Sequence, residues 1–162
     1  MENNYILSLL IWLPVLGMVA IAFIPREKEN SIKIAAAITT GVQFTLTLIL
    51  WNGFDLQNGG MQKNEMYNWI PSFNISYHLG VDGLSLPMVI LTGMLFFIGV
   101  FVSWNIKKAV KGYFALFLML NTGVMGVFLS LDFFLFYIFW EVMLLPMYFL
   151  IGMWGGPQRE YA

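Results

Sequence analysis

The sequence predicts an all-α integral membrane protein with about five transmembrane helices. Of its 162 residues, 59% are apolar and only 10% are charged, and the mean hydropathy is +0.76. The charged residues lie almost entirely between apolar runs, and five of these runs are close to the roughly 20 residues needed to cross a bilayer core of about 30 Å. A water-soluble domain of average composition carries far more charge, so this class is excluded.

The expected spans are separated by short polar connections, except for one long one. The first span has neither the basic start nor the cleavage site of a signal peptide, so we expect it to be a retained transmembrane helix. Residues 52–80 are polar and predict an extramembrane loop, in which a short interfacial helix and a hairpin both remain open. Only Ser130, Leu131 and Asp132 interrupt the apolar run between the last two spans, which predicts a tight turn and antiparallel neighbours. The spans are 6–24, 31–51, 82–104, 112–131 and 133–154.

Basic residues indicate how the chain is oriented. Seven of the eight lie on one side of the predicted bundle and one lies on the other, which is a positive-inside pattern. We therefore expect a multi-pass protein with its N-terminus and the 52–80 loop outside. The absence of a transit peptide favours a bacterial inner (plasma) membrane, with an organellar membrane left open. The seven are Arg26, Lys28, Lys33, Lys107, Lys108, Lys111 and Arg159, against Lys63.

Several kinds of chemistry are excluded by composition. The net charge of −1 gives no support for nucleic-acid binding, and the chain has no Cys for disulfides, thiolate metal sites or iron–sulfur ligation. The single histidine, His78, has no ligand-type neighbours at metal-binding spacing, so we interpret it as an interfacial residue. The sequence contains neither a phosphate-binding glycine loop nor a nucleophile elbow.

The main functional signal is Glu141, the only charged side chain deep inside a predicted span. A carboxylate at this depth is costly, and such residues usually serve proton or ion pathways. Tyr137 and Tyr148 fall on the same helical face as Glu141. Pro146 lacks an N–H, so the Val142 carbonyl is left free and could hold water. A structural glutamate that bonds a neighbouring helix remains the alternative.

Other polar residues predict helix ends and packing. Asp82 with Ser85 is expected to cap the third helix, and Asp132 to cap the fifth. A stripe of small and polar residues in the fourth span predicts close helix packing, with a hydrated path as the alternative. This stripe consists of Asn121, Thr122, Gly123 and Gly126.

Three stretches resemble a known family. They are FWEVMLLPMYFLI at 139–151, LDFFLF at 131–136 and GVDGLS at 80–85. Together they are similar to subunit M of the proton-pumping NADH:quinone oxidoreductase, respiratory complex I, an antiporter-like family related to the Mrp-type antiporters. The resemblance covers essentially the whole chain but only about the first third of such a subunit.

The resemblance implies an N-terminal part of an antiporter-like bundle. Residues 1–111 would hold three transmembrane helices with the outer-side loop at about 52–80, and 112–162 the first two helices of the transport core, truncated. Glu141 matches the family glutamate that pairs with a lysine on a later helix and relays protons. Tyr137, Tyr148 and Pro146 would support it.

The resemblance also implies cofactors and partners. NADH, FMN, iron–sulfur clusters and quinone belong to the complex, whereas no cofactor is expected in this chain. The partners would be the lipid bilayer and other membrane subunits, including neighbouring antiporter-like ones, and not nucleic acid. Two alternatives stay open: an Mrp-type sodium/proton antiporter subunit, and a non-transporting membrane scaffold in which Glu141 is structural.

Overall fold

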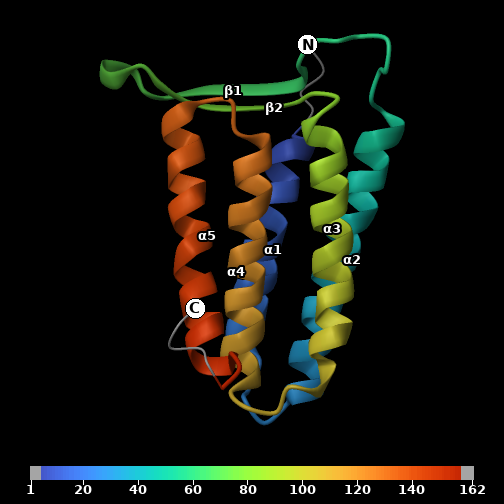
Figure 1. The fold of residues 1–162 in the computed structure, drawn as a ribbon, viewed down its shortest axis with the longest axis vertical. Coiled ribbons are helices and arrows are strands. Elements are labelled where there is room, and N and C mark those ends of the chain that lie inside the picture. Colours follow the sequence, from blue (N-terminus) through green and yellow to red (C-terminus); the bar gives the residue numbers. More distant parts are fainter. Residues whose placement is uncertain (1–4, 158–162) are drawn as a thin grey trace.

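The computed structural model describes residues 5–157, which form five long helices with a two-stranded hairpin across one end (Figure 1). All five helices are long and apolar enough to cross a membrane, which confirms the predicted fold class. The helices are α1 (Ile6–Phe23), α2 (Glu29–Asn52), α3 (Ser85–Val102), α4 (Val110–Leu129) and α5 (Phe133–Trp154), and the strands are β1 (Gln62–Ile70) and β2 (Ile75–Val81).

Helix α4 lies at the centre of the bundle, where it packs against α1, α5 and α3. The contact between α4 and α5 is the most extensive, as the short connection between them predicts. Gly123 and Gly126 make it possible. A Cβ atom on Gly123 would lie 2.8 Å from the Met143 Cα, and one on Gly126 would collide with the Phe139 ring. The packing interpretation of these two glycines is confirmed.

The predicted end of the fourth span at residue 131 is wrong, because α4 ends at Leu129. Beyond it the chain turns toward the hairpin: Ser130 forms a bridge with Leu79, and the Leu131 N–H donates to the His78 carbonyl at 2.8 Å. The connection to α5 is therefore held by β2 as well as being short. Hydropathy could not predict this end, because Leu131 is apolar whether it continues the helix or hydrogen-bonds to β2.

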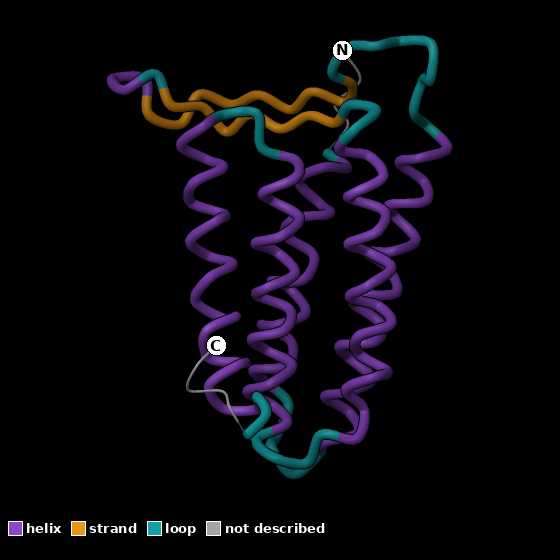
Figure 2. The backbone as a smooth tube through the Cα atoms, in the orientation of Figure 1, coloured by secondary structure: helices purple, strands orange, loops and turns teal. Residues whose placement is uncertain are grey.

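The 52–80 loop contains a hairpin, which decides between the two predicted alternatives. Strands β1 and β2 are antiparallel, and a short 3₁₀ turn (Pro71–Phe73) joins them through Asn74 in a left-handed conformation. Figure 2 shows the strands lying across the helix ends rather than along them. The strands extend the predicted loop by one residue, to Val81.

Two carboxylates fix the hairpin to the bundle. Glu65 of β1 accepts hydrogen bonds from the Leu7 N–H at 2.8 Å and from the Ser8 N–H at 3.2 Å, at the start of α1. Asp132, at the start of α5, accepts one from the Ser76 N–H of β2 at 3.1 Å. Anions are favourable at helix N-termini, so both contacts are stabilising.

The α1–α2 and α3–α4 connections lie at the end opposite the hairpin (Figure 1). At that end, the Lys111 ammonium on α4 donates to the Ala22 and Ile24 carbonyls at 2.8 and 2.9 Å, at the end of α1. Lys63 belongs to the hairpin at the other end. Of the residues used for the topology prediction, Arg159 lies outside the described residues.

Candidate functional site

Glu141 lies on an exposed face of α5. Its neighbours on this face recur every three or four residues, so they form one stripe along the helix. Tyr137 and Tyr148 are 53% and 75% exposed, which places both predicted supporting tyrosines on the Glu141 face. The stripe consists of Phe133, Tyr137, Glu141, Leu145 and Tyr148.

The depth of Glu141 follows from its place in α5, which runs from Phe133 to Trp154. At about 1.5 Å per residue, the carboxylate-bearing residue is about 12 Å from the start of the helix and about 20 Å from its end. Tyr137 lies one turn before Glu141 on the same face of the helix. A carboxylate with a single neighbouring hydroxyl remains poorly compensated at membrane depth.

Pro146 is buried and lies within α5, which continues through it to Trp154. Because proline has no N–H, the Val142 carbonyl receives no helical hydrogen bond from position 146. The helix therefore carries an acceptor one residue after Glu141 in the sequence. That this carbonyl holds water beside Glu141 stays a prediction.

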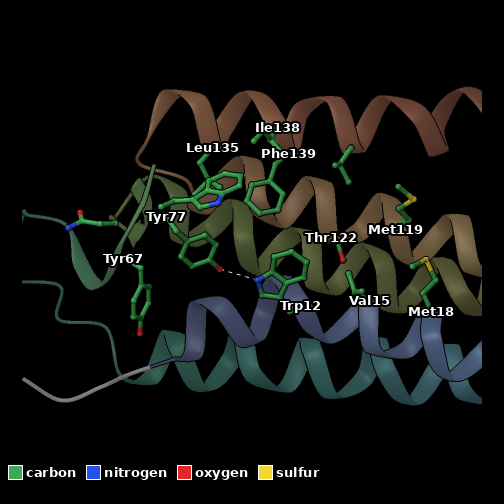
Figure 3. Close-up of a pocket in the computed structure, with 13 residues that line it drawn as sticks. Trp12, Val15, Met18, Tyr67, Tyr77, Met119, Thr122, Leu135, Ile138 and Phe139 are labelled. Atoms are coloured by element: carbon green, nitrogen blue, oxygen red, sulfur yellow. Dashed lines mark hydrogen bonds between the residues drawn. The ribbon is translucent and has the colours of Figure 1, made fainter. Parts of the chain in front are cut away.

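A cavity of about 510 Å³ lies on a different face of α5. Its lining is almost entirely apolar and comes from α1, α4, α5 and the hairpin, as Figure 3 shows for Trp12, Thr122 and Phe139. At its hairpin end the Trp12 ring N–H donates to the Tyr77 hydroxyl at 3.1 Å. Glu141 does not line this cavity, so the cavity and the carboxylate are separate features.

A buried polar contact joins three helices at the centre of the bundle. The Asn121 amide of α4 donates to the Gln43 side-chain oxygen of α2 at 2.6 Å, and the Gln43 amide donates to the Leu10 carbonyl of α1 at 2.8 Å. Asn121 and Gln43 are both fully buried. The Asn121 Oδ1 and Thr122 Oγ1 atoms are buried without a hydrogen-bond partner among the described residues. Glycine packing therefore explains only part of the predicted stripe.

The predicted Asp132 cap is confirmed, and Asp82 accepts hydrogen bonds at the start of α3, although Leu84 is the residue directly before this helix. Asp82 accepts from the Ser85 N–H at 2.7 Å, and the Ser85 hydroxyl oxygen accepts from the Asp82 N–H at 3.0 Å. This reciprocal pair precedes the regular part of α3, which begins at Ser85 rather than at residue 82. Hydrogen bonds from the Ser85 backbone and side chain lower the pKa of the Asp82 carboxyl below its usual value.

Asp132 accepts from the Phe134 and Leu135 N–H groups at 2.9 and 3.1 Å. Burial raises the pKa of its carboxyl, but the hydrogen bonds from Ser76, Leu135 and Phe134 together lower it more, so the net pKa is below the usual value. Asp132 therefore links α5 to the hairpin in its charged form. Sequence reasoning found this cap but not its second partner, Ser76.

Sequence reasoning missed Glu65 altogether. Glu65 is only 5% exposed, and its partners Leu7 and Ser8 lie 58 and 57 residues away in the chain. No local motif marks such a contact. His78 lies in β2 at the hairpin end of the bundle, partly buried. Among residues 5–157, no group of three or more His, Asp or Glu side chains could hold a metal ion.

The sequence is similar to known proteins over nearly its whole length. A relative named NAD(P)H-quinone oxidoreductase chain 4 3 from Trichormus variabilis is 32% identical over 157 residues, covering 96% of this chain and 29% of the relative. A chloroplastic NAD(P)H-quinone oxidoreductase chain 4 from Chlorokybus atmophyticus is 36% identical over 163 aligned residues, covering 100% of this chain and 32% of the relative. The chain thus spans about a third of the length of these relatives.

Two further comparisons agree with these. The family described as "NADH:quinone oxidoreductase/Mrp antiporter, TM" matches residues 130–162, which include Glu141. In fold, the chain is similar to one chain of respiratory complex I from Thermus thermophilus with bound NADH, with a TM-score of 0.77 and 22% identity. This similarity covers 96% of the present chain and 30% of the other.

Proposed function

We propose that this chain, which is homologous to the antiporter-like membrane subunits of complex I, is the N-terminal part of subunit M and takes part in proton translocation. In the assembled NADH:quinone oxidoreductase, this translocation would be coupled to electron transfer from NADH to quinone. The chain itself would supply no redox centre. Its partners would be other membrane subunits, including neighbouring antiporter-like ones.

The position of Glu141 carries this proposal. The carboxylate lies well inside a membrane-spanning helix, on a face that none of the other described helices covers. Apart from Tyr137, one turn away on the same face, its environment would come from lipid or from protein beyond this part of the chain. A cationic partner on a later helix would stabilise the charged form and allow a proton to move between the two groups. On this proposal residues 112–162 begin the transport core and residues 1–111 precede it.

The test is Glu141→Gln in the complete subunit within its assembled complex. Glutamine keeps the size and much of the hydrogen bonding but cannot titrate, so proton pumping per NADH oxidised should fall several-fold while the amount of assembled complex stays the same. Glu141→Asp should keep part of the pumping, because water can bridge the missing methylene.

Glu27→Gln is the matched control, since Glu27 is an exposed carboxylate in the connection between α1 and α2. It should pump and assemble like the unmodified complex. If Glu141→Gln also assembles and pumps normally, the relay role of Glu141 is wrong and the scaffold alternative is favoured.

We further propose that the hairpin end faces outward, with the N-terminus outside, in a bacterial inner membrane. Single cysteines at exposed hairpin positions, such as Met66→Cys, should react with an impermeant thiol reagent added to intact cells. Lys107→Cys, in the connection at the opposite end, should react only after the membrane is opened. Labelling in the reverse order would overturn this orientation.

An Mrp-type sodium/proton antiporter subunit is the second candidate, favoured by the joint description of the matching family. The two candidates differ in their partners. Affinity purification of the full-length protein should recover NADH-oxidising subunits if it belongs to complex I, and sodium/proton antiporter subunits without them if it does not.

A further inference from the structure

A second cavity, of about 690 Å³, lies at the end of the bundle opposite the hairpin. Its walls come from the last turns of α1 and the first turns of α4, with small apolar residues such as Ala22 and Ala115. Unlike the first cavity, it also carries charged side chains. They are Arg26, Glu29 and Lys111.

The charges of this cavity favour one bound anion. Two cationic side chains and one carboxylate leave a formal charge of +1. Lys111 is held in place because its ammonium donates to the Ala22 and Ile24 carbonyls, and an ammonium group has a third N–H to offer. Arg26 is exposed at the rim, and its guanidinium matches the geometry of phosphate oxygens.

The two cavities are neighbours along α1, because Met18 lines both, and the pair is called the groove. Its charged side chains belong to the cavity at the end of the bundle opposite the hairpin, and most of its other lining residues, largely from α1 and α4, are apolar. A ligand that fits it has a small anionic head and a long, thin apolar tail.

The mixed lining of the groove, charged at one end and apolar beyond it, matches the two parts of a phospholipid. An acyl chain is one methylene wide and can follow the groove. Basic pockets between transmembrane helices near the membrane surface are typical sites for anionic lipid head groups.

We propose that this groove binds one anionic phospholipid, with its phosphate between Arg26 and Lys111 and an acyl chain running past Met18 toward the apolar cavity. The single negative charge of a phosphodiester balances the +1 of the lining. This site lies apart from Glu141, so it does not depend on the role proposed for that residue.

The experiment uses the full-length subunit in its complex, reconstituted in discs of equal parts phosphatidylglycerol and phosphatidylcholine. Native mass spectrometry should find phosphatidylglycerol retained on the subunit in preference to phosphatidylcholine. Arg26→Gln should lower this retention by about fivefold, the effect expected for one basic residue near the surface. Arg26 is chosen because removing Lys111 would also remove its contacts with α1.

Lys107→Gln is the matched control, because Lys107 lies in the neighbouring connection but does not line the cavity. It should leave phosphatidylglycerol retention unchanged. Ala22→Trp, which fills the cavity, should abolish retention while the complex still assembles.

Equal retention of the two lipids would overturn the proposal, and so would equal effects of Arg26→Gln and Lys107→Gln. If Ala22→Trp prevents assembly and leaves lipid retention on the remaining complex unchanged, the groove is filled by another helix and the proposal is also wrong. Proton pumping is not the readout, so these outcomes are separate from the Glu141 test.

Discussion

Helices α4 and α5 are consecutive and of similar length, yet they occupy opposite situations in the bundle. In their most apolar 18-residue windows, 44% of α4 is buried but only 17% of α5. Each helix also carries a strongly polar side chain near its middle. Asn121 of α4 is fully buried against Gln43, whereas Glu141 of α5 is exposed.

This difference separates structural from functional polarity. The two windows have nearly the same mean hydropathy, 1.7 and 1.9, so hydropathy does not distinguish the helices. The position in the bundle does: the polar group of α4 finds its main partner within the described part of the chain, and that of α5 faces outward. Substitutions along α4 should therefore affect folding. Substitutions on the exposed face of α5 should mainly affect the interactions of that face with lipid or with other protein segments.

The largest expected effect is at the contact between the two helices. Gly126→Ala places a methyl group against the Phe139 ring, and overpacking of this kind typically costs about 1–3 kcal/mol. We expect a marked loss of folded, purified full-length subunit and a lower unfolding temperature.

Gly152→Ala is the matched control, since nothing lies within 4 Å of the added atom in α5. It should leave the unfolding temperature nearly unchanged. Equal effects of the two substitutions would show that α4 and α5 do not pack in this register.

Sequence patterns predicted what depends on neighbours along the chain. The spans follow from runs of apolar residues, and the Asp82 and Asp132 caps follow from residues two or three positions away. The Glu65 contact with α1 joins residues 58 positions apart, so no local pattern reveals it.

The same limit applies to the candidate site. The sequence identifies Glu141 as unusual because a charge interrupts an apolar run. Whether that charge faces the bundle interior depends on how α5 is rotated against α4, which Gly123 and Gly126 decide through their contacts with Met143 and Phe139. Its exposure could therefore not be predicted from hydropathy, and its role stays a prediction.

A smaller effect is expected at the buried amide pair. Asn121→Leu leaves the Gln43 side-chain oxygen without its donor, which should lower the free energy of unfolding by about 1–2 kcal/mol. Gln43→Leu should cost a similar amount. Because each change removes the same contact, the double variant should cost less than the sum of the two single ones.

The measurement is a double-mutant cycle on the unfolding of the full-length subunit. Exact additivity would contradict an energetic coupling between α2 and α4 through these amides. It would also weaken the contrast with α5, because the polar group of α4 would then contribute no more to folding than an exposed one.

The smallest effect is expected at the start of α5. It tests whether this end of the helix is more stably attached to the bundle than its exposed middle. Asp132→Ala removes the cap of α5 and its contact with Ser76, and loss of such a cap typically costs about 1 kcal/mol. Asp132→Asn should cost less, because the amide oxygen can still accept hydrogen bonds. The unfolding temperature of the full-length subunit at pH 7 checks that Asp132→Ala costs more stability than Asp132→Asn.

The pH dependence of Asp132→Asn sharpens this test. The pKa of the Asp132 carboxyl is lowered in the folded protein from its model-compound value of 3.8. Its contribution to stability is therefore complete above that value and is lost as the pH falls through the lower folded-state pKa. The difference between the unmodified protein and Asp132→Asn should be constant above about pH 5 and shrink below about pH 4. A difference that grows with falling pH would mean that burial, rather than the three N–H donors, dominates at the start of α5, and that the end of this helix is no better anchored than its middle.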